Sequence, residues 1–236
     1  MSAKHLPQEP HDNAADQIIP LLWIRRSIGV LGILFPFILA LGNYFFFECH
    51  QILPTISDYF HTRMMTIFVA ILSMISIFLW TYRGPKGEDK HWATLASVLC
   101  LGIALFPNDL KEVVKVCNDY TAHSQDTLHH ICAISMFLIL AYFSLFLFTK
   151  TNKNLHEVSD PDIQLKLKRN NIYKTCGYVI LLSIFLVGVG YLLSRNGVSV
   201  PTTYIFWLES VALFAFGVSW ITKGNWFIYG DKSSDK

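Results

Sequence analysis

Long apolar runs recur along the chain and are separated by short polar segments. They cover residues 27–47, 64–82, 92–106, 131–148, 172–193 and 204–222. A helix needs about 20 apolar residues to cross the hydrocarbon core of a bilayer, and inside lipid its backbone must satisfy its own hydrogen bonds. The pattern therefore predicts an all-α integral membrane protein, a bundle of six transmembrane helices. The third run is short and needs an extra turn from His91 or from Pro107 onward.

The runs and their polar flanks divide the chain into three parts. Residues 1–20 are polar and are predicted to form a flexible cytoplasmic tail. Residues 21–226 form the predicted six-helix transmembrane domain, and residues 227–236 a second cytoplasmic tail. The stretch 164–170, in the loop before the fifth run, is expected to form a short surface helix.

The composition agrees with a membrane location. The mean hydropathy is +0.39 and only 15% of the residues are charged, whereas soluble domains carry about a quarter. The net charge of +2 is too small to indicate a nucleic-acid partner.

The basic residues gather in alternate loops. Most of the 19 Lys and Arg residues lie before the first run, between the second and third, between the fourth and fifth, and after the sixth. The opposite loops carry only Arg63, Lys111, Lys115 and Arg195. Because Lys and Arg flank the cytoplasmic ends of spans, both termini are predicted in the cytoplasm. The membrane is the inner or plasma membrane if the chain is bacterial, and an endomembrane or the plasma membrane if it is eukaryotic.

Glu209 stands alone in the sixth apolar run, about one and a half turns from its outer end. A carboxylate at that depth costs a few kcal/mol unless it is paired, protonated or facing a cavity. A structural pairing that pins the last helix to the bundle and a functional role both fit this position. The expected partners come from the outer ends of other elements: Ser57, His61, Arg63, His129, His130 and Arg195.

Two spacings near the predicted outer face suggest shared helix faces. Ser57 and His61 are four residues apart, so a second helix that starts by Ser57 places both on one face. Asp126 stands three residues before His129 and four before His130, so a helical extension places it beside one of them. The further members of the expected polar cluster are Asp58, Arg63 and Glu209.

Imidazoles and carboxylates on one face raise the question of a metal. A catalytic zinc site takes three protein ligands and leaves a position for water. The candidate ligands are His61, Asp109, His129 and His130, with Asp126 as another carboxylate. The alternative is an ordinary polar interface, since the chain has none of the HExxH, HxxxH or CxxC patterns.

Two cysteines fall in the predicted outer loops. Cys49 follows the first run and Cys117 follows the third. They can pair as a disulfide if that side is an oxidising compartment, or remain two free thiols; neither spacing nor count decides between these.

At the outer face the sequence resembles a known family. The stretch Pro54-Thr55-Ile56-Ser57-Asp58 is similar to the Pro-x-Ile-Ser-Asp signature of a six-helix membrane family. That family contains the damage-regulated autophagy modulators, the FGF-receptor-activating proteins of GPI-anchor remodelling, and the Sfk proteins. Trp207-Leu208-Glu209 resembles its last helix, which carries an acidic residue. The resemblance implies six helices and a link to lipid remodelling or distribution.

A second resemblance points to a different chemistry. Ser57 and His61, at Ser-x-x-x-His spacing, are similar to the second helix of the CREST superfamily of zinc-dependent membrane hydrolases. Members of that superfamily usually have seven helices and a His-x-x-x-His in the last one, and the last predicted helix here has no His.

Three functions therefore fit the sequence. The first is binding of, or action on, membrane lipid by the outer polar cluster, without catalysis. The second is a zinc-dependent membrane-embedded lipid amidase or esterase, with Ser57, His61 and Glu209 as catalytic residues. The third is a small transporter, although the spans offer few polar residues at mid-depth. Membrane lipid is the expected partner, and the sequence leaves the oligomeric state open.

Overall fold

The computed structural model describes residues 14–47, 50–82, 87–109, 125–150 and 161–226. All regular secondary structure in these residues is helical, as the sequence predicts. The elements, in chain order, are α1 (Ala14–Phe46), the 3₁₀ helix η1 (Ser57–His61), α2 (Met65–Thr81), α3 (Gly87–Leu105), α4 (Asp126–Tyr142), the π-helical turn η3 (Phe143–Leu147), α5 (Pro161–Arg195) and α6 (Tyr204–Lys223).

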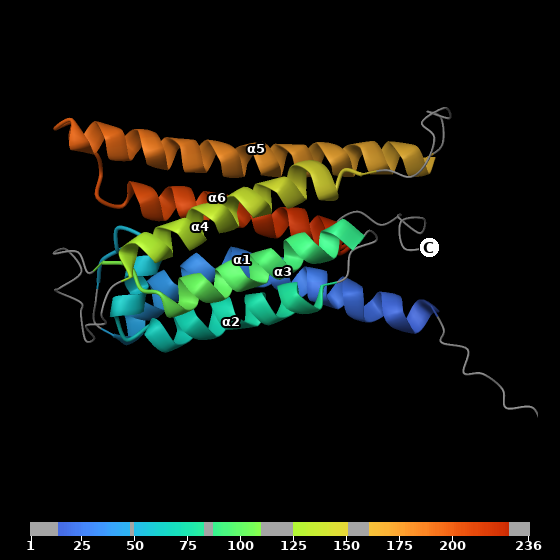
Figure 1. Cartoon of the computed structure of the whole chain (residues 1–236), viewed down its shortest axis with the longest axis horizontal. Helices are drawn as coiled ribbons and strands as arrows, with labels where there is room; N and C mark the ends of the chain where they lie inside the picture. The colour runs from blue at the N-terminus through green and yellow to red at the C-terminus, as the bar shows by residue number, and fades with distance from the viewer. Residues whose placement is uncertain (1–13, 48–49, 83–86, 110–124, 151–160, 227–236) are drawn as a thin grey trace, which may run out of the picture.

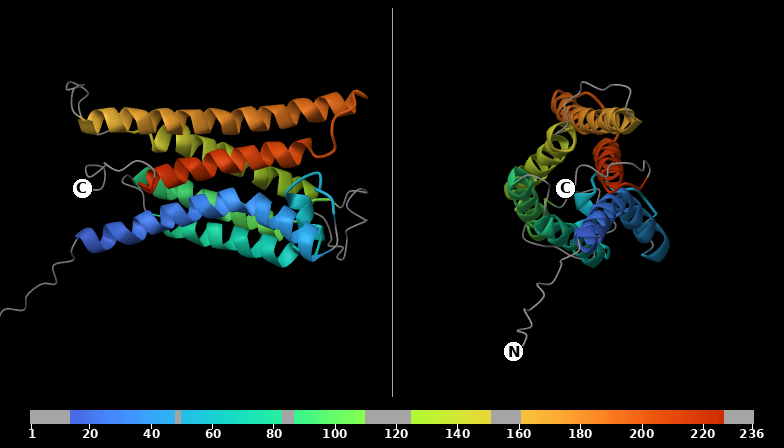
Figure 2. Two further views of the ribbon diagram at one scale, coloured as in Figure 1. Left: turned by 180° about the vertical axis from the view of Figure 1, so that it is seen from behind. Right: turned by 90° about the vertical axis from the view of Figure 1, so that its right-hand side faces the viewer.

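The six long helices form a ring in chain order. Each packs against the next one along the chain, and α6 closes the ring by packing against α1 (Figure 2). Successive helices run in opposite directions (Figure 1). One end of the bundle, here called the η1 end, therefore holds η1, the ends of α1, α3 and α5, and the beginnings of α2, α4 and α6.

Within the described residues, four stretches are long and apolar enough to cross a membrane. They are Leu22–Phe46, Asp126–Leu147, Gln164–Arg195 and Tyr204–Lys223. The helix α2 is apolar but has only 17 residues, and α3 begins with the charged residues Glu88 and Asp89. The structure is thus consistent with a multi-pass integral membrane protein, while the count of six spans and their orientation stay predictions.

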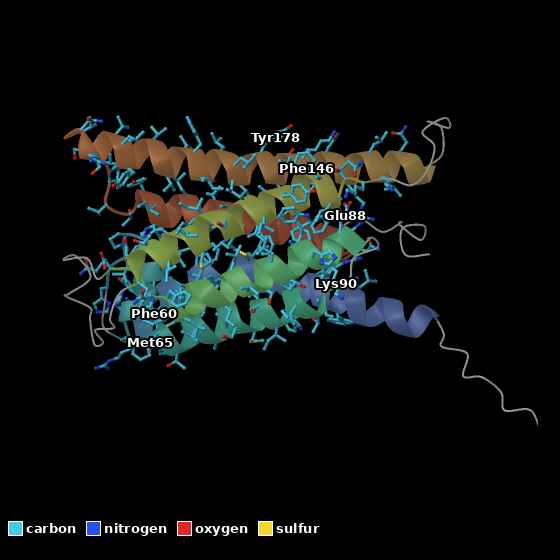
Figure 3. The ribbon with its side chains drawn as sticks, viewed as in Figure 1. Phe60, Met65, Glu88, Lys90, Phe146 and Tyr178 are labelled. Atoms are coloured by element: carbon cyan, nitrogen blue, oxygen red, sulfur yellow. The ribbon has the colours of Figure 1, made fainter. Side chains whose placement is uncertain are left out.

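The outer sides of the helices are apolar. Phe185 and Tyr178 on α5 are 66% and 63% exposed, and Phe146 in η3 is 55% exposed. In Figure 3, Phe60 and Met65 mark the η1 end, and Glu88 and Lys90 mark the opposite end. Exposed aromatic side chains in such number are unusual on a monomeric soluble protein, and they suit a lipid environment.

Several helices extend beyond the apolar runs that predicted them. The helix α1 begins at Ala14, inside the stretch expected to be a flexible tail. The helix α5 begins at Pro161, so residues 164–170 are its first turns and not a separate surface helix. Hydropathy reports only burial in lipid, whereas helical hydrogen bonds continue into polar flanks wherever the residues tolerate them. Residues 1–13 and the predicted tail 227–236 lie outside the described residues.

The helices α1 and α6 cross at two glycines. A Cβ atom on Gly29 would lie 2.7 Å from the carbonyl oxygen of Gly217, and one on Gly217 would lie 2.5 Å from that of Gly29. Small residues allow this close backbone approach between membrane helices. One turn further along α6, Trp220 is fully buried and packs edge-on against the ring of Tyr82.

Candidate functional site

Reciprocal hydrogen bonds start η1 where the chain enters the bundle. The backbone N–H of Thr55 donates to the Asp58 carboxylate at 2.9 Å, and the backbone N–H of Asp58 donates to the Thr55 hydroxyl at 3.1 Å. This arrangement resembles a capping box, in which each of two side chains accepts a hydrogen bond from the backbone N–H of the other residue. It fixes the direction in which η1 leaves Pro54.

Asn108, just after α3, ties η1 to that helix. Its side-chain amide donates to Oδ1 of Asp58 at 2.7 Å, and its backbone carbonyl oxygen accepts from Nε2–H of His61 at 2.8 Å. Asp58 and His61 are fully buried, and Asn108 is 3% exposed. A buried carboxylate is stable only when it is well hydrogen-bonded, so these contacts explain how Asp58 is tolerated in the core.

Ser57 and His129 form a direct pair between η1 and α4. The Ser57 hydroxyl lies 2.8 Å from Nε2 of His129, and Nδ1 of His129 lies 2.8 Å from the carbonyl oxygen of Phe106. A carbonyl oxygen can only accept, so Nδ1 carries the proton and Nε2 of the neutral ring accepts from Ser57. His129 is 3% exposed, whereas Ser57 is half-buried.

Glu209 joins α6 to the segment before η1. Its Oε2 accepts from the backbone N–H of Ile56 at 2.9 Å, and the backbone N–H of Phe206 donates to the Pro54 carbonyl at 2.9 Å. The carboxylate lies on the inner side of α6, where it lines two cavities. The expectation that Glu209 faces the interior thus agrees with the structure, and the partner seen here is a backbone amide.

The larger cavity, about 150 Å³, lies between α4, α5 and α6 at the η1 end and is here called the lateral cleft. Its polar end is formed by Thr55, Ser57, Asn108, His129 and Glu209. Its walls are apolar and include Ile134, Phe137, Ile184, Val187 and Leu208. A second cavity of about 60 Å³ lies inside the ring of helices and shares four residues with the first: Ser57, Ala133, Phe137 and Glu209.

Tyr59 lies in η1, two residues after Ser57, and its ring packs against that of Phe206. Its side chain is fully buried, and its hydroxyl accepts from the backbone N–H of Leu53 at 3.4 Å. Burial away from water raises the pKa of this phenol to about 12, because the phenolate loses its hydration, and the nearby Asp58 charge acts in the same direction. Tyr59 is therefore a neutral core residue.

The residues predicted to bind zinc do not come together. The described residues include no group of three His, Cys, Asp or Glu side chains placed to hold a metal ion. His61 and His129 are each engaged by a backbone carbonyl. Asp109 is exposed, and its backbone N–H donates to Asp126 at 3.0 Å. The zinc site stays a prediction that this geometry does not favour.

Of the two predicted shared helix faces, the structure has the one of Asp126 and His130 and lacks the one of Ser57 and His61. His130 pairs with Asp126 at 3.4 Å, the two side chains being 60% and 40% exposed, so Asp126 sits beside His130. Ser57 and His61 do not share a helix face, because they lie in a 3₁₀ helix, where residues three apart are aligned. Ser57 consequently contacts α4, while His61 contacts the residue after α3.

Three groups of the site were not predicted from the sequence. Thr55 and Asn108 are ordinary polar loop residues in the sequence, and the Phe106 carbonyl has no side-chain signal at all. Of the remaining candidates, Arg63 is exposed and outside the lateral cleft. Cys49 and Cys117, the predicted disulfide, lie outside the described residues.

No protein-family model, no curated protein and no solved structure matches this chain. The family resemblances noted above therefore remain predictions.

Proposed function

We propose that this protein binds a membrane lipid in the lateral cleft, as a six-span bundle with both termini in the cytoplasm and the η1 end facing outward. The observation that carries the proposal is the cleft itself, which joins a cluster of polar side chains to apolar walls. Such a site matches an amphiphile, with its head group against Ser57, His129 and Glu209 and the start of an acyl chain along the walls.

The course of α4 supports entry of a lipid from the side. Near the opposite end, η3, which continues α4, is in tight contact with α5, since a Cβ atom on Gly177 would overlap the side chain of Leu145. Towards the η1 end the two helices separate in both side views (Figures 1 and 2), and the lateral cleft lies there. Ile134, on its wall, is 51% exposed, so the cleft reaches the lipid-facing surface.

The size of the cleft limits what enters it. A cavity of roughly this volume holds a benzene-sized molecule in other proteins. The lateral cleft therefore accommodates a polar linkage and the first carbons of one chain, while the rest of the lipid stays in the bilayer. Membrane lipids joined by an ester or an amide have this shape.

Photocrosslinking in vesicles tests the proposal. The full chain is reconstituted in phosphatidylcholine with a small fraction of a phosphatidylcholine that carries a photoreactive group near the first carbons of its acyl chain. Crosslinks are expected at α4, α5 and α6 residues of the cleft. Ile184→Trp, which fills the cleft, should reduce them by about tenfold.

Phe185→Trp is the matched control, because Phe185 neighbours Ile184 in α5 but is 66% exposed and points away from the cleft. It should leave the cleft crosslinks unchanged. Crosslinks spread evenly over the exposed faces of all helices, or an equal effect of both substitutions, would overturn the proposal.

A further inference from the structure

The Ser57–His129 pair has the arrangement of an activated nucleophile. Nucleophilic serines need a base within hydrogen-bond reach and a third group that orients that base. Here Nε2 of His129 lies 2.8 Å from the Ser57 hydroxyl, and the Phe106 carbonyl holds Nδ1–H at 2.8 Å. The carbonyl fixes the tautomer and the ring orientation, a task that a carboxylate performs in the familiar triad.

The position of Ser57 relative to the cleft gives the pair access to a substrate. Ser57 is the first residue of η1 and lines both cavities. It therefore belongs to the polar end of the lateral cleft and also borders the second cavity. A lipid bound with its head among the polar groups and its chain along the walls places its ester or amide linkage beside this hydroxyl.

The two buried histidines near η1 differ in what they contact. His61 is fully buried and bonds only through Nε2, to the backbone carbonyl of Asn108, while its Nδ1 has no hydrogen-bond partner among the described residues. His129 instead directs its unprotonated nitrogen at a hydroxyl that is half-buried and faces a cavity. His130, the next residue, is exposed and pairs with Asp126, so of these two adjacent histidines it is His129 that accepts a hydrogen bond from a serine.

We propose that Ser57 is a nucleophile, activated by His129, for acyl transfer from a lipid ester or amide bound in the lateral cleft. The Ser57 oxygen attacks the carbonyl carbon as its proton passes to Nε2 of His129. The bond from that carbon to the leaving oxygen or nitrogen then breaks, and His129 returns the proton to the leaving group. Water or a second alcohol, deprotonated by His129, releases the acyl group from Ser57. The identity of the substrate as a lipid rests on the function proposed above.

A fluorophosphonate with a long alkyl chain tests the nucleophile directly, because it phosphonylates activated serines without turnover. The full chain in phosphatidylcholine vesicles should be labelled at Ser57, as mapped by mass spectrometry of its peptides, and Ser57→Ala should lose the label. Ser210→Ala should keep it, since Ser210 is a buried serine of α6 that lines neither cavity.

The base is tested by a matched pair of substitutions. His129→Gln should slow labelling at least ~100-fold, the lower range for loss of a general base. His91→Gln, at an exposed histidine of α3 that lines neither cavity, should leave the rate within about twofold. If His129→Gln fails to fold, Ser57→Cys provides the second measurement. A thiol at this position should react with iodoacetamide markedly faster than the native Cys132, which lies in the same helix as His129.

Several outcomes would overturn the dyad: no label on Ser57, equal rates in the two histidine variants, or a Ser57→Cys thiol no faster than Cys132. If cleft crosslinks to lipid persist in those cases, the dyad fails and lipid binding stands. If Ser57 is labelled while the cleft shows no lipid crosslinks, the nucleophile stands and the lipid assignment fails.

Discussion

The backbone N–H of Ile56 donates a hydrogen bond of 2.9 Å to the carboxylate of Glu209, a residue 153 positions later in the chain. This contact fastens the loop that carries η1 to the last helix. Because α6 also packs against α1 and α5, the same bond links the polar end of the lateral cleft to the closure of the ring. Glu209, the charged residue in the apolar helix α6, thus connects the lateral cleft with the contact between α6 and α1.

Removing the acceptor at residue 209 should cost stability. Glu209→Leu leaves the buried Ile56 N–H without its partner, and we expect a loss of ~1–3 kcal/mol in the free energy of unfolding. Glu209→Gln keeps an amide oxygen that can accept, so most of the stability should remain. Equilibrium unfolding in detergent micelles measures both. Trp207→Leu, at an exposed position of α6, should shift stability by less than ~0.5 kcal/mol. Equal losses for Leu and Gln at residue 209 would contradict the assignment.

The glycine crossing of α1 and α6 should not tolerate a methyl group. Gly217→Ala places a Cβ 2.5 Å from the Gly29 carbonyl oxygen, so the helices must separate, at a cost of about 1–3 kcal/mol. Gly188→Ala in α5 is the matched control, because no atom lies within 4 Å of its added Cβ. Alanine there should be neutral or stabilising by up to ~1 kcal/mol. The two variants are compared by thermal unfolding in one detergent, and equal melting temperatures would refute the crossing.

The buried phenol of Tyr59 should make the protein less stable at high pH. Its pKa is about 12 in the folded state and about 10 in an unfolded chain. Between those pH values the unfolded state loses this proton and the folded state keeps it, so stability falls as pH rises from about 10 to about 12. Below that window the group contributes no pH dependence. Tyr59→Phe should flatten the decline in unfolding free energy, whereas Tyr178→Phe, at an exposed ring, should not.

Labelling from outside intact cells should separate the two ends of the bundle. In a variant whose native cysteines are replaced, Arg195→Cys at the η1 end should react with a membrane-impermeant maleimide. Lys90→Cys at the opposite end should react only after permeabilisation. Both positions are exposed, so access to the thiol depends on the membrane alone. The reverse pattern would place the η1 end in the cytoplasm and contradict the predicted orientation.

The grouping of the site residues could be anticipated, but their pairing could not. Alternating helix directions bring Ser57, His129 and Glu209 to one end, since each lies near the same end of an apolar run. The spacing argument for Ser57 and His61 assumed an α-helix, and the chain forms a 3₁₀ helix there. That change turns the serine toward α4 and the histidine toward Asn108.

The sequence by itself determined the all-helical class and the position of the apolar helices, because burial in lipid requires long apolar runs with internal hydrogen bonds. Tertiary structure decided which polar groups meet. The Phe106 carbonyl and the Ile56 amide are backbone groups that every residue type carries, so no sequence pattern marks them. They acquire a role only when the closed ring of helices brings them within 3 Å of His129 and Glu209.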